Sequence, residues 1–413
     1  MIALQRRHRV SFGRALAAAL AVVVGSTVAV PVPASAANVV KVGVDLPTSG
    51  ADATNGIPTR NGVILAVEQA NAKPLPGGLK FEVSSLDDAV QGVHDPAQGA
   101  QNVKTFIADS AVLGIIGPFN SNVAKAEIPL TNDAGLVQIS PSATNPGLTK
   151  GDDAKKLRTS HPDVNAFFRV CTTDDRQGAA GAMFAKKLNL KKAFIIDDNE
   201  TYGTGLANVF EAEFKRLGGT VLGHEHITKG QQDFKALLTK VHSAGPDMVF
   251  FGGTTASGGG LVRKQMADVG MRDVKYVGGD GISDEEFLKQ TGDMASNSYY
   301  TVAAPETSKL ASAKSFVAAY KKRFGSNPGP YSANAYAGAQ VIIAAVLKGV
   351  KDNGGKVPTR LEVRQNVAAT KNLDTPIGKI GFDSNGDTTA PILSLYRIAS
   401  GKAQFVEQLN LKG

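Results

Sequence analysis

The chain has 413 residues, of which 42% are hydrophobic and 20% are charged. This composition is typical of a folded soluble protein, and the length predicts two domains rather than one. The formal net charge is +8, and it falls to +4 (41 basic against 37 acidic residues) when the first 36 residues are left out. So small an excess does not indicate nucleic-acid binding.

The N-terminal segment 1–36 has the three parts of a secretory signal peptide. Four arginines and no acid accompany an apolar run at 15–30, and Ala34 and Ala36 place small residues at alternate positions. We therefore expect cleavage near residue 36 and export to the periplasm. The alternative, a membrane anchor, would need about 20 apolar residues. Cys171 is the only cysteine, so no lipid anchor at the cleavage site and no internal disulfide are expected.

Short apolar runs then alternate with longer helical patterns. In the first half we expect strands at 39–44, 79–86, 111–116 and 136–139, and helices at 58–72, 97–108 and 123–133. This alternation predicts a parallel sheet covered by helices on both faces. The polar stretch 149–165 is interpreted as a segment that crosses to a second domain.

The same alternation restarts in the second half of the chain. We expect helices at 178–188, 205–217 and 234–244 and strands at 192–196, 220–224, 248–251 and 274–277, followed by helices at 312–324 and 334–348 and a strand at 392–398. Each half has enough elements for its own sheet, so the sequence predicts an α/β protein with two lobes.

Polar residues follow these strands, and in open α/β sheets ligands bind beyond the carboxyl ends of the strands. Ser121 stands where the strand at 111–116 turns into a helix, a position that favours an anion such as a carboxylate, although helix capping explains it equally well. Ser142 and Thr144 lie two apart in QISPSATNP, so an extended backbone would point both the same way. A proline-rich turn with internally bonded hydroxyls is the alternative.

Asp280 follows the predicted strand end KYVGG in the second half. A carboxylate at this place can hold a cation, although a surface position would also explain it. Hydroxyls and amides on one half and an acid on the other together suit a zwitterion, which carries both charges.

Five segments then match a known family in order and spacing. They are KVGVDLPTSG, GIIGPFNSNVAKAEIPLTNDAGLVQISPSATNP, DNETYGTGLA, VFFGGTTASGGGLVRKQMADVG and VGGDGISDEEFL. With these segments, nearly the whole chain after residue 36 resembles the periplasmic leucine/isoleucine/valine-binding proteins, the solute receptors of ABC importers.

The resemblance implies a type I periplasmic-binding-protein fold, with two Rossmann-like lobes of parallel sheets joined by three hinge crossings. Lobe 1 would comprise 37–165 and 303–386, and lobe 2 would comprise 166–302 and 387–413. It also implies a monomer that binds an α-amino acid, branched-chain or similarly apolar, and delivers it to a membrane permease.

The resemblance also implies which residues bind the carboxylate and the ammonium of the amino acid. Ser121 matches the serine that binds the ligand carboxylate, and Thr144 matches the threonine that serves carboxylate and ammonium. Ser142 matches an alanine whose backbone carbonyl receives the ammonium. Asp280 matches the acid that pairs with it.

Four further positions correspond to the walls of the family's side-chain pocket. Tyr202 and Tyr331 match aromatic residues that close it. Asn55 and Thr254 stand where leucine-type proteins have tyrosines, which implies a roomier or more polar pocket. Relatives that bind amides, urea or aromatic acids are therefore an alternative, as is an extracytoplasmic ligand sensor, but a ligand without an ammonium would leave Asp280 unpaired.

Other classes of protein have weaker support from the sequence. GGTTASGGG lacks the ending of a phosphate-binding loop, and Ser257 is not in a nucleophile elbow, so neither an enzyme nor a cofactor is expected. His224 and His226 alternate on a predicted strand without an evident third ligand, so no metal site is expected. DSNGD at 383–387 is interpreted as a tight turn rather than a calcium loop. A DNA-binding repressor of this architecture would need a helix-turn-helix where the export signal stands.

Overall fold

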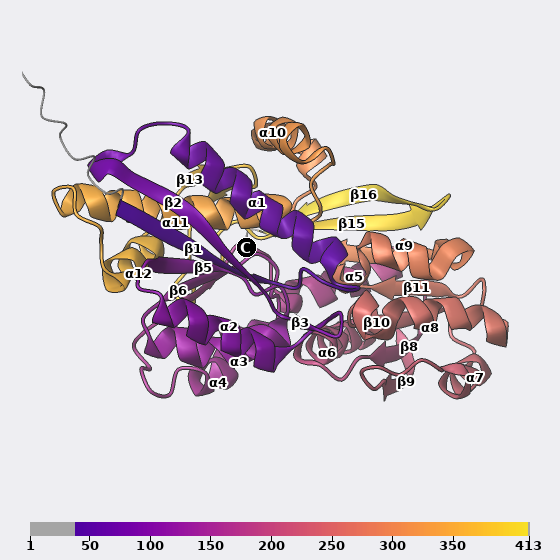
Figure 1. Ribbon diagram of the computed structural model, residues 1–413. Coiled ribbons are helices and arrows are strands. Elements are labelled where there is room, and N and C mark those ends of the chain that lie inside the picture. Colours follow the sequence, from indigo (N-terminus) through magenta and orange to yellow (C-terminus); the bar gives the residue numbers. More distant parts are fainter. Residues whose placement is uncertain (1–37, 412–413) are drawn as a thin grey trace, which may run out of the picture. The chain divides into compact units, whose positions relative to one another are not determined.

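The computed structural model describes residues 38–411, which belong to one compact unit. The predicted signal peptide lies outside these residues. Two large sheets, each covered by helices, organise the described part of the chain (Figure 1). We call the parts built on the first and second of these sheets lobe 1 and lobe 2.

The sheet of lobe 1 has five parallel strands in the order β2-β1-β5-β6-β7. Parallel strands that are buried on both faces need near-continuous apolar sequence, and VLGII in β5 is buried throughout. The strands are β1 (Asn38–Leu46), β2 (Leu79–Asp87), β5 (Val112–Ile116), β6 (Val137–Ser140) and β7 (Phe167–Arg169).

Helices α1 and α11 cover one face of this sheet, and α2 and α3 cover the other (Figure 1). The apolar helix α11 is long enough to cross a membrane, but 72% of its most apolar window is buried, so it is a core helix of lobe 1. The helices are α1 (Ala53–Asn71), α2 (Pro96–Ala108), α3 (Ser121–Asp133), α10 (Lys314–Phe324), α11 (Ser332–Asp352) and α12 (Arg360–Ala368).

The sheet of lobe 2 has seven strands in the order β16-β15-β12-β11-β10-β8-β9. Five are parallel, namely β8 (Lys192–Asp197), β9 (Thr220–His226), β10 (Met248–Gly252), β11 (Lys275–Gly278) and β12 (Ser298–Val302). The main helices around them are α5 (Asp174–Lys187), α6 (Thr201–Arg216), α7 (Lys235–Ala244), α8 (Gly260–Gln265) and α9 (Glu285–Thr291).

An antiparallel hairpin completes this second sheet and adds to its predicted parallel strands. Strands β15 (Ile392–Ala399) and β16 (Lys402–Asn410) pair with each other, and β15 pairs with β12. The connection consists of Ser400 and Gly401, with φ of 52° and 67°. Two positive φ values in a two-residue connection are typical of a tight hairpin turn.

The chain passes between the two sheets three times: after β7, after β12 and before β15. The predicted first crossing at 149–165 is wrong. That segment contains the short helix α4 (Gly151–Lys156) and returns to add β7, in which Phe167 pairs with Gln138 of β6. Lobe 1 therefore extends past residue 165, because the apolar run FFR of β7 belongs to its sheet.

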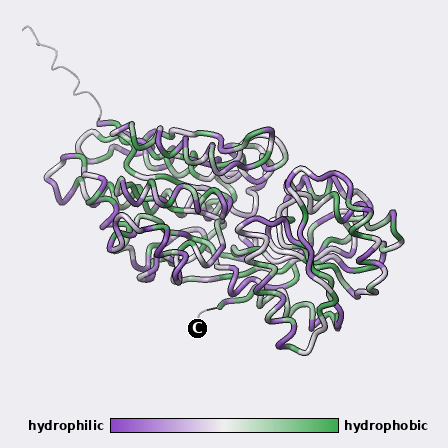
Figure 2. Tube along the Cα trace, turned by 90° about the horizontal axis from the view of Figure 1, so that it is seen from below, coloured by the Kyte–Doolittle hydropathy of each residue, from purple (hydrophilic) through white to green (hydrophobic). Residues whose placement is uncertain are grey.

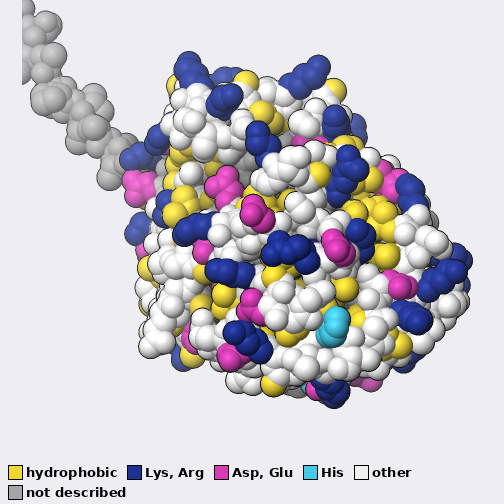
Figure 3. All heavy atoms as spheres, turned by 90° about the vertical axis from the view of Figure 1, so that its right-hand side faces the viewer, with side chains coloured by type: hydrophobic (Ala, Val, Ile, Leu, Met, Phe, Trp, Pro, Cys, Tyr) yellow, Lys and Arg dark blue, Asp and Glu magenta, His cyan; other side chains and the backbone are white. Residues whose placement is uncertain are grey.

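Hydrophobic stretches lie inside each lobe and hydrophilic stretches run along the outer loops (Figure 2). On the face shown in Figure 3, lysine and arginine side chains are interspersed with aspartate and glutamate. This mixed surface agrees with the small net charge of the sequence.

Candidate functional site

A small cavity lies where the strands of both sheets end. Its lining includes Ser121 and Ser142 from lobe 1 and Tyr202, Thr254 and Asp280 from lobe 2. Five of the eight residues predicted for the site are thus brought together. The cavity measures about 20 Å³, which is about enough for one water molecule. A larger solute can therefore enter only when the two lobes move apart.

Ser121 begins helix α3, as its position after a strand predicted. Its hydroxyl accepts a hydrogen bond from the backbone N–H of Asn145 (3.2 Å). Because Ser121 is the first helical residue, unbonded N–H groups and the positive end of the helix dipole lie beside it. The site therefore has the features of an anion-binding position.

Residues 140–146, which we call the clamp segment, pass beside this helix start. The hydroxyl of Ser140 accepts from the backbone N–H groups of Ser142 (3.2 Å) and Ala143 (2.8 Å). Ser142 donates its own hydroxyl to the carbonyl of Phe119 (2.9 Å). Its carbonyl oxygen accepts no hydrogen bond from residues 38–411, so this oxygen can receive a donor from a ligand.

Thr144 does not line the cavity. Its hydroxyl donates to the carboxylate of Asp174 (3.0 Å), and its carbonyl accepts from the backbone N–H of Asp174 (3.0 Å). Burial, followed by the nearby charge of Asp280, raises the pKa of Asp174 well above its ordinary value. The sequence reasoning missed Asp174, because the expected helix begins at 178 and no strand was predicted before Asp174.

Asp280 is the buried acid of the cavity. Its Oδ1 accepts from Gln177 Nε2 (2.6 Å) and the Tyr202 hydroxyl (3.1 Å), and its Oδ2 accepts from the Tyr331 hydroxyl (2.9 Å). Burial raises the pKa of Asp280, whereas these hydrogen bonds oppose the rise. The carboxylate is held in place but is incompletely compensated, as a partner for a cation should be.

Two tyrosines orient this acid: Tyr202, which lines the cavity, and Tyr331, which does not. Tyr202 also accepts from the backbone N–H of Gly281 (3.1 Å), and Tyr331 accepts from the N–H of Ala303 (3.2 Å). Tyr331 packs edge-on against Phe119, with ring centroids 5.4 Å apart. Gln177 and Phe119 were not predicted, because Gln177 lies inside α5 and Phe119, although it follows β5, is apolar.

Asn55 and Thr254, the two positions that depart from the family pattern, behave differently from each other. Thr254 lines the cavity, and its hydroxyl accepts from the backbone N–H of Ser257 (3.0 Å). Asn55 instead donates to Asp284 (3.3 Å) in a separate groove. Burial raises the pKa of Asp284 to about 7.

A buried histidine joins the two lobes beside this groove. In β4 (Val93–His94) of lobe 1, His94 bonds Asp52 through Nδ1 and Glu200 of lobe 2 through Nε2, each at 2.7 Å. Lys229 donates to the His94 carbonyl (2.9 Å), and the buried Asp88 is close enough to interact electrostatically with His94. Burial alone would lower the pKa of His94, but the two bonded carboxylates raise it to about 10.

A family model described as "Periplasmic binding protein" matches residues 39–403. The chain belongs to this family. A Leu/Ile/Val-binding protein of Rhizobium johnstonii is 31% identical over 365 residues, which cover 88% of this periplasmic binding protein and 92% of that relative.

Two solved structures also share the architecture. The leucine-binding protein LivK of Thermotoga maritima is 27% identical, with a TM-score of 0.78. The branched-chain amino acid binding protein LivJ of Streptococcus pneumoniae, in complex with isoleucine, is 28% identical, with a TM-score of 0.77. Each comparison covers 90% of this periplasmic binding protein and 99% of the other chain. The predicted type I fold is thereby confirmed.

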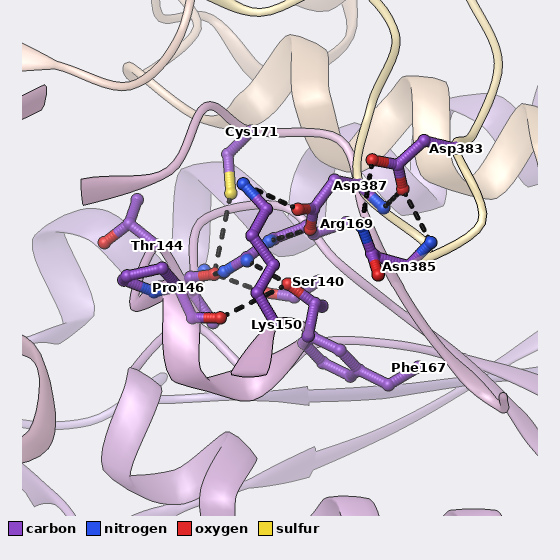
Figure 4. Close-up of polar contacts among 12 residues, drawn as sticks. Ser140, Thr144, Pro146, Lys150, Phe167, Arg169, Cys171, Asp383, Asn385 and Asp387 are labelled. Atoms are coloured by element: carbon purple, nitrogen blue, oxygen red, sulfur yellow. Dashed lines mark hydrogen bonds and ion pairs between the residues drawn. The ribbon is translucent and has the colours of Figure 1, made fainter. Parts of the chain in front are cut away.

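Arg169 holds the clamp segment of this periplasmic binding protein in place (Figure 4). Its fully buried guanidinium donates to the carbonyls of Ala143 (2.9 Å) and Asn145 (2.7 Å) and pairs with Asp387 (2.7 Å). The clamp segment is therefore tied to both the first crossing, after β7, and the third crossing, before β15. The sequence reasoning did not single out this arginine.

Two motifs that the sequence analysis compared with a calcium loop and a phosphate-binding loop have structural roles in this periplasmic binding protein. In DSNGD, the Asp383 carboxylate accepts from the N–H groups of Asn385 and Asp387 (2.9 Å each), which makes a turn. In GGTTASGGG, the Ser257 hydroxyl donates to Asp198 (2.6 Å). Both contacts stabilise loops at strand ends.

Proposed function

We propose that this protein is the extracytoplasmic solute-binding protein of an ABC importer and that it binds an α-amino acid with an apolar, branched side chain. The observation that carries the proposal is the meeting of Ser121 and Ser142 of lobe 1 with Asp280 of lobe 2 over one cavity. The anion-binding start of α3 thus lies on lobe 1, and the acid that can pair with a cation lies on lobe 2. The names of the relatives, which refer to leucine, isoleucine and valine, support the choice of solute.

Binding would begin on lobe 1 of the open protein. The ligand carboxylate meets the Ser121 hydroxyl and the N–H groups at the start of α3, where the helix dipole favours a negative charge. Thr144 can also bind the ligand carboxylate only if its hydroxyl turns away from Asp174, to which it donates in this structure. The ligand ammonium then lies near the free carbonyl of Ser142.

Closure would bring Asp280 of lobe 2 onto the ammonium. Gln177 and Tyr202, which belong to lobe 2 like Asp280, bond its carboxylate and fix its position beforehand, so little order has to be created on binding. Exclusion of water strengthens the interaction between the opposite charges. The closed monomer would be the form that the membrane permease recognises, and residues 1–36 would direct export to the periplasm. The role is delivery of an unchanged solute and requires no catalytic step.

Calorimetric titration of residues 37–413, unfolded and refolded to remove bound solute, tests the proposal. The panel comprises leucine, isoleucine, valine, phenylalanine, glutamate, urea and benzoate. We expect micromolar or tighter binding of the branched-chain amino acids. Binding of urea or benzoate alone would contradict the proposal and would favour the amide or aromatic-acid relatives.

A further inference from the structure

Two histidines and one aspartate converge at the ends of two neighbouring strands of lobe 2. His224 and His226 lie on one face of β9, and Asp197 ends the adjacent parallel strand β8 opposite His226. One ligand-type atom from each residue lies within 4.8 Å of the other two. The sequence alone offered no third ligand, because Asp197 is far from the histidines along the chain.

Both imidazole rings are directed at the same carboxylate. His224 Nε2 lies 2.8 Å from Asp197 Oδ2, and His226 Nδ1 lies 2.7 Å from Asp197 Oδ1. Zinc holds nitrogen and oxygen ligands at about 2.0–2.2 Å, so the atoms of a tetrahedral set lie about 3.3 Å apart. An ion therefore needs only small outward shifts of the rings to lie between these atoms.

The surroundings fix the ligands as known zinc sites do. His224 Nδ1 bonds Glu211 Oε2 (2.7 Å), which orients the ring and leaves Nε2 directed at the site. Asp197 is buried, and its Oδ1 also accepts from the backbone N–H of Asn199 (2.8 Å) and from Thr204 (3.1 Å). Its Oδ2 accepts only from His224 among the described residues, so this oxygen is the natural carboxylate ligand.

The site is also accessible from solvent. The His226 side chain is 53% exposed and the His224 side chain 17% exposed, whereas Asp197 is fully buried. An ion can reach the two rings without a change in the fold. A water molecule can occupy the fourth position, as in zinc sites with three protein ligands.

We propose that Asp197, His224 and His226 form a binding site for one divalent transition-metal ion, with Glu211 as the supporting carboxylate. Two imidazoles and one carboxylate suit Zn²⁺ and its neighbours rather than Mg²⁺ or Ca²⁺, which prefer oxygen ligands. None of the three residues lines the cavity proposed for the amino acid. Ion binding would link the ends of β8 and β9 and is independent of the proposed function.

Equilibrium dialysis of tag-free residues 37–413 against Zn²⁺ tests the proposal. We expect one ion per chain in the wild type, at least tenfold weaker binding in His226→Gln, and no comparable binding of Mg²⁺ or Ca²⁺. His242→Gln is the matched control, because His242 is an exposed histidine of α7 outside the cluster. The overturning results are no stoichiometric zinc in the wild type, or equal losses in the two variants.

Co²⁺ provides a second readout. A visible spectrum of tetrahedral intensity is expected in the wild type and in His242→Gln but not in His226→Gln, and an octahedral spectrum in the wild type overturns the proposed coordination. Leucine titration of the same variants keeps the two proposals separate. Unchanged leucine affinity in His226→Gln together with lost zinc confirms an independent site, whereas joint loss of both contradicts this independence.

Discussion

The replacement Asp280→Asn removes the charge of the buried acid while its neighbours can keep their hydrogen bonds. The amide oxygen can still accept from Gln177 and Tyr202, and the amide nitrogen can donate to the Tyr331 hydroxyl. The Tyr331 hydroxyl already accepts from the N–H of Ala303, so it would then accept from two donors. The fold should therefore be preserved, and the change isolates the charge.

The expected loss of amino-acid affinity is large. Removing one partner of a desolvated charge pair costs roughly 2–5 kcal/mol, which corresponds to about a 30- to 4000-fold rise in Kd. Asp280 is only 6% exposed, so bulk water has little access to the charge. This burial favours the upper half of the range. Calorimetric titration with leucine measures it directly.

Glu127→Gln serves as the matched control. Glu127 is also a fully buried acid, but it belongs to α3 and does not line the cavity. Burial and the nearby Asp45 raise the pKa of Glu127 well above the ordinary value, and the amide of Gln keeps the size and shape of the side chain. Leucine affinity within about threefold of the wild type in Asp280→Asn, or an equal loss in both variants, would refute the assigned role of Asp280.

Three further predictions follow from other contacts. Ser121→Ala should weaken leucine binding by about 1–3 kcal/mol in titrations, since backbone donors remain, and an unchanged Kd would make Ser121 only a helix start. His94 has a folded pKa of about 10, above its ordinary 6.5. Its stabilisation, on the order of a few kcal/mol, is therefore complete below about pH 6.5 and is lost toward pH 10. Urea unfolding of wild type and His94→Gln should converge over that interval, and parallel profiles would contradict the pairing. Arg169→Met leaves the buried Asp387 paired only with the partly exposed Lys150 (3.2 Å), and should lower the unfolding free energy by roughly 3 kcal/mol. A loss under 1 kcal/mol in urea would show that Arg169 does not brace the clamp segment.

The alternation of apolar and amphipathic segments was enough to predict most of the core elements, because buried parallel strands need apolar runs. The inner strand β12 was also missed, and so were elements at the margins. Strand β16 (KAQFVEQLN) is a half-exposed hairpin arm and reads as polar. Helix α12 is short and mostly polar, although Thr359 and Glu362 form a capping box that marks its start.

The candidate site was predictable where a residue directly follows a strand. Ser121, Ser142 and Asp280 could be found in this way, since parallel strands end at a common edge. Asp174 and Gln177 lie within or at the start of α5, and only the packing of that helix brings them to Thr144 and Asp280. Asn55 was placed by resemblance, and its bond to Asp284 depends on how the two lobes meet.

The central claim is that the protein recognises both charges of a zwitterion, the carboxylate at the start of α3 in lobe 1 and the ammonium chiefly at Asp280 in lobe 2. Titration of the wild type with leucine, with 4-methylpentanoate, which lacks the ammonium, and with 3-methylbutylamine, which lacks the carboxylate, tests it most directly. We predict that each analogue binds at least a hundredfold more weakly than leucine. Binding of 4-methylpentanoate as tight as that of leucine would contradict the claim.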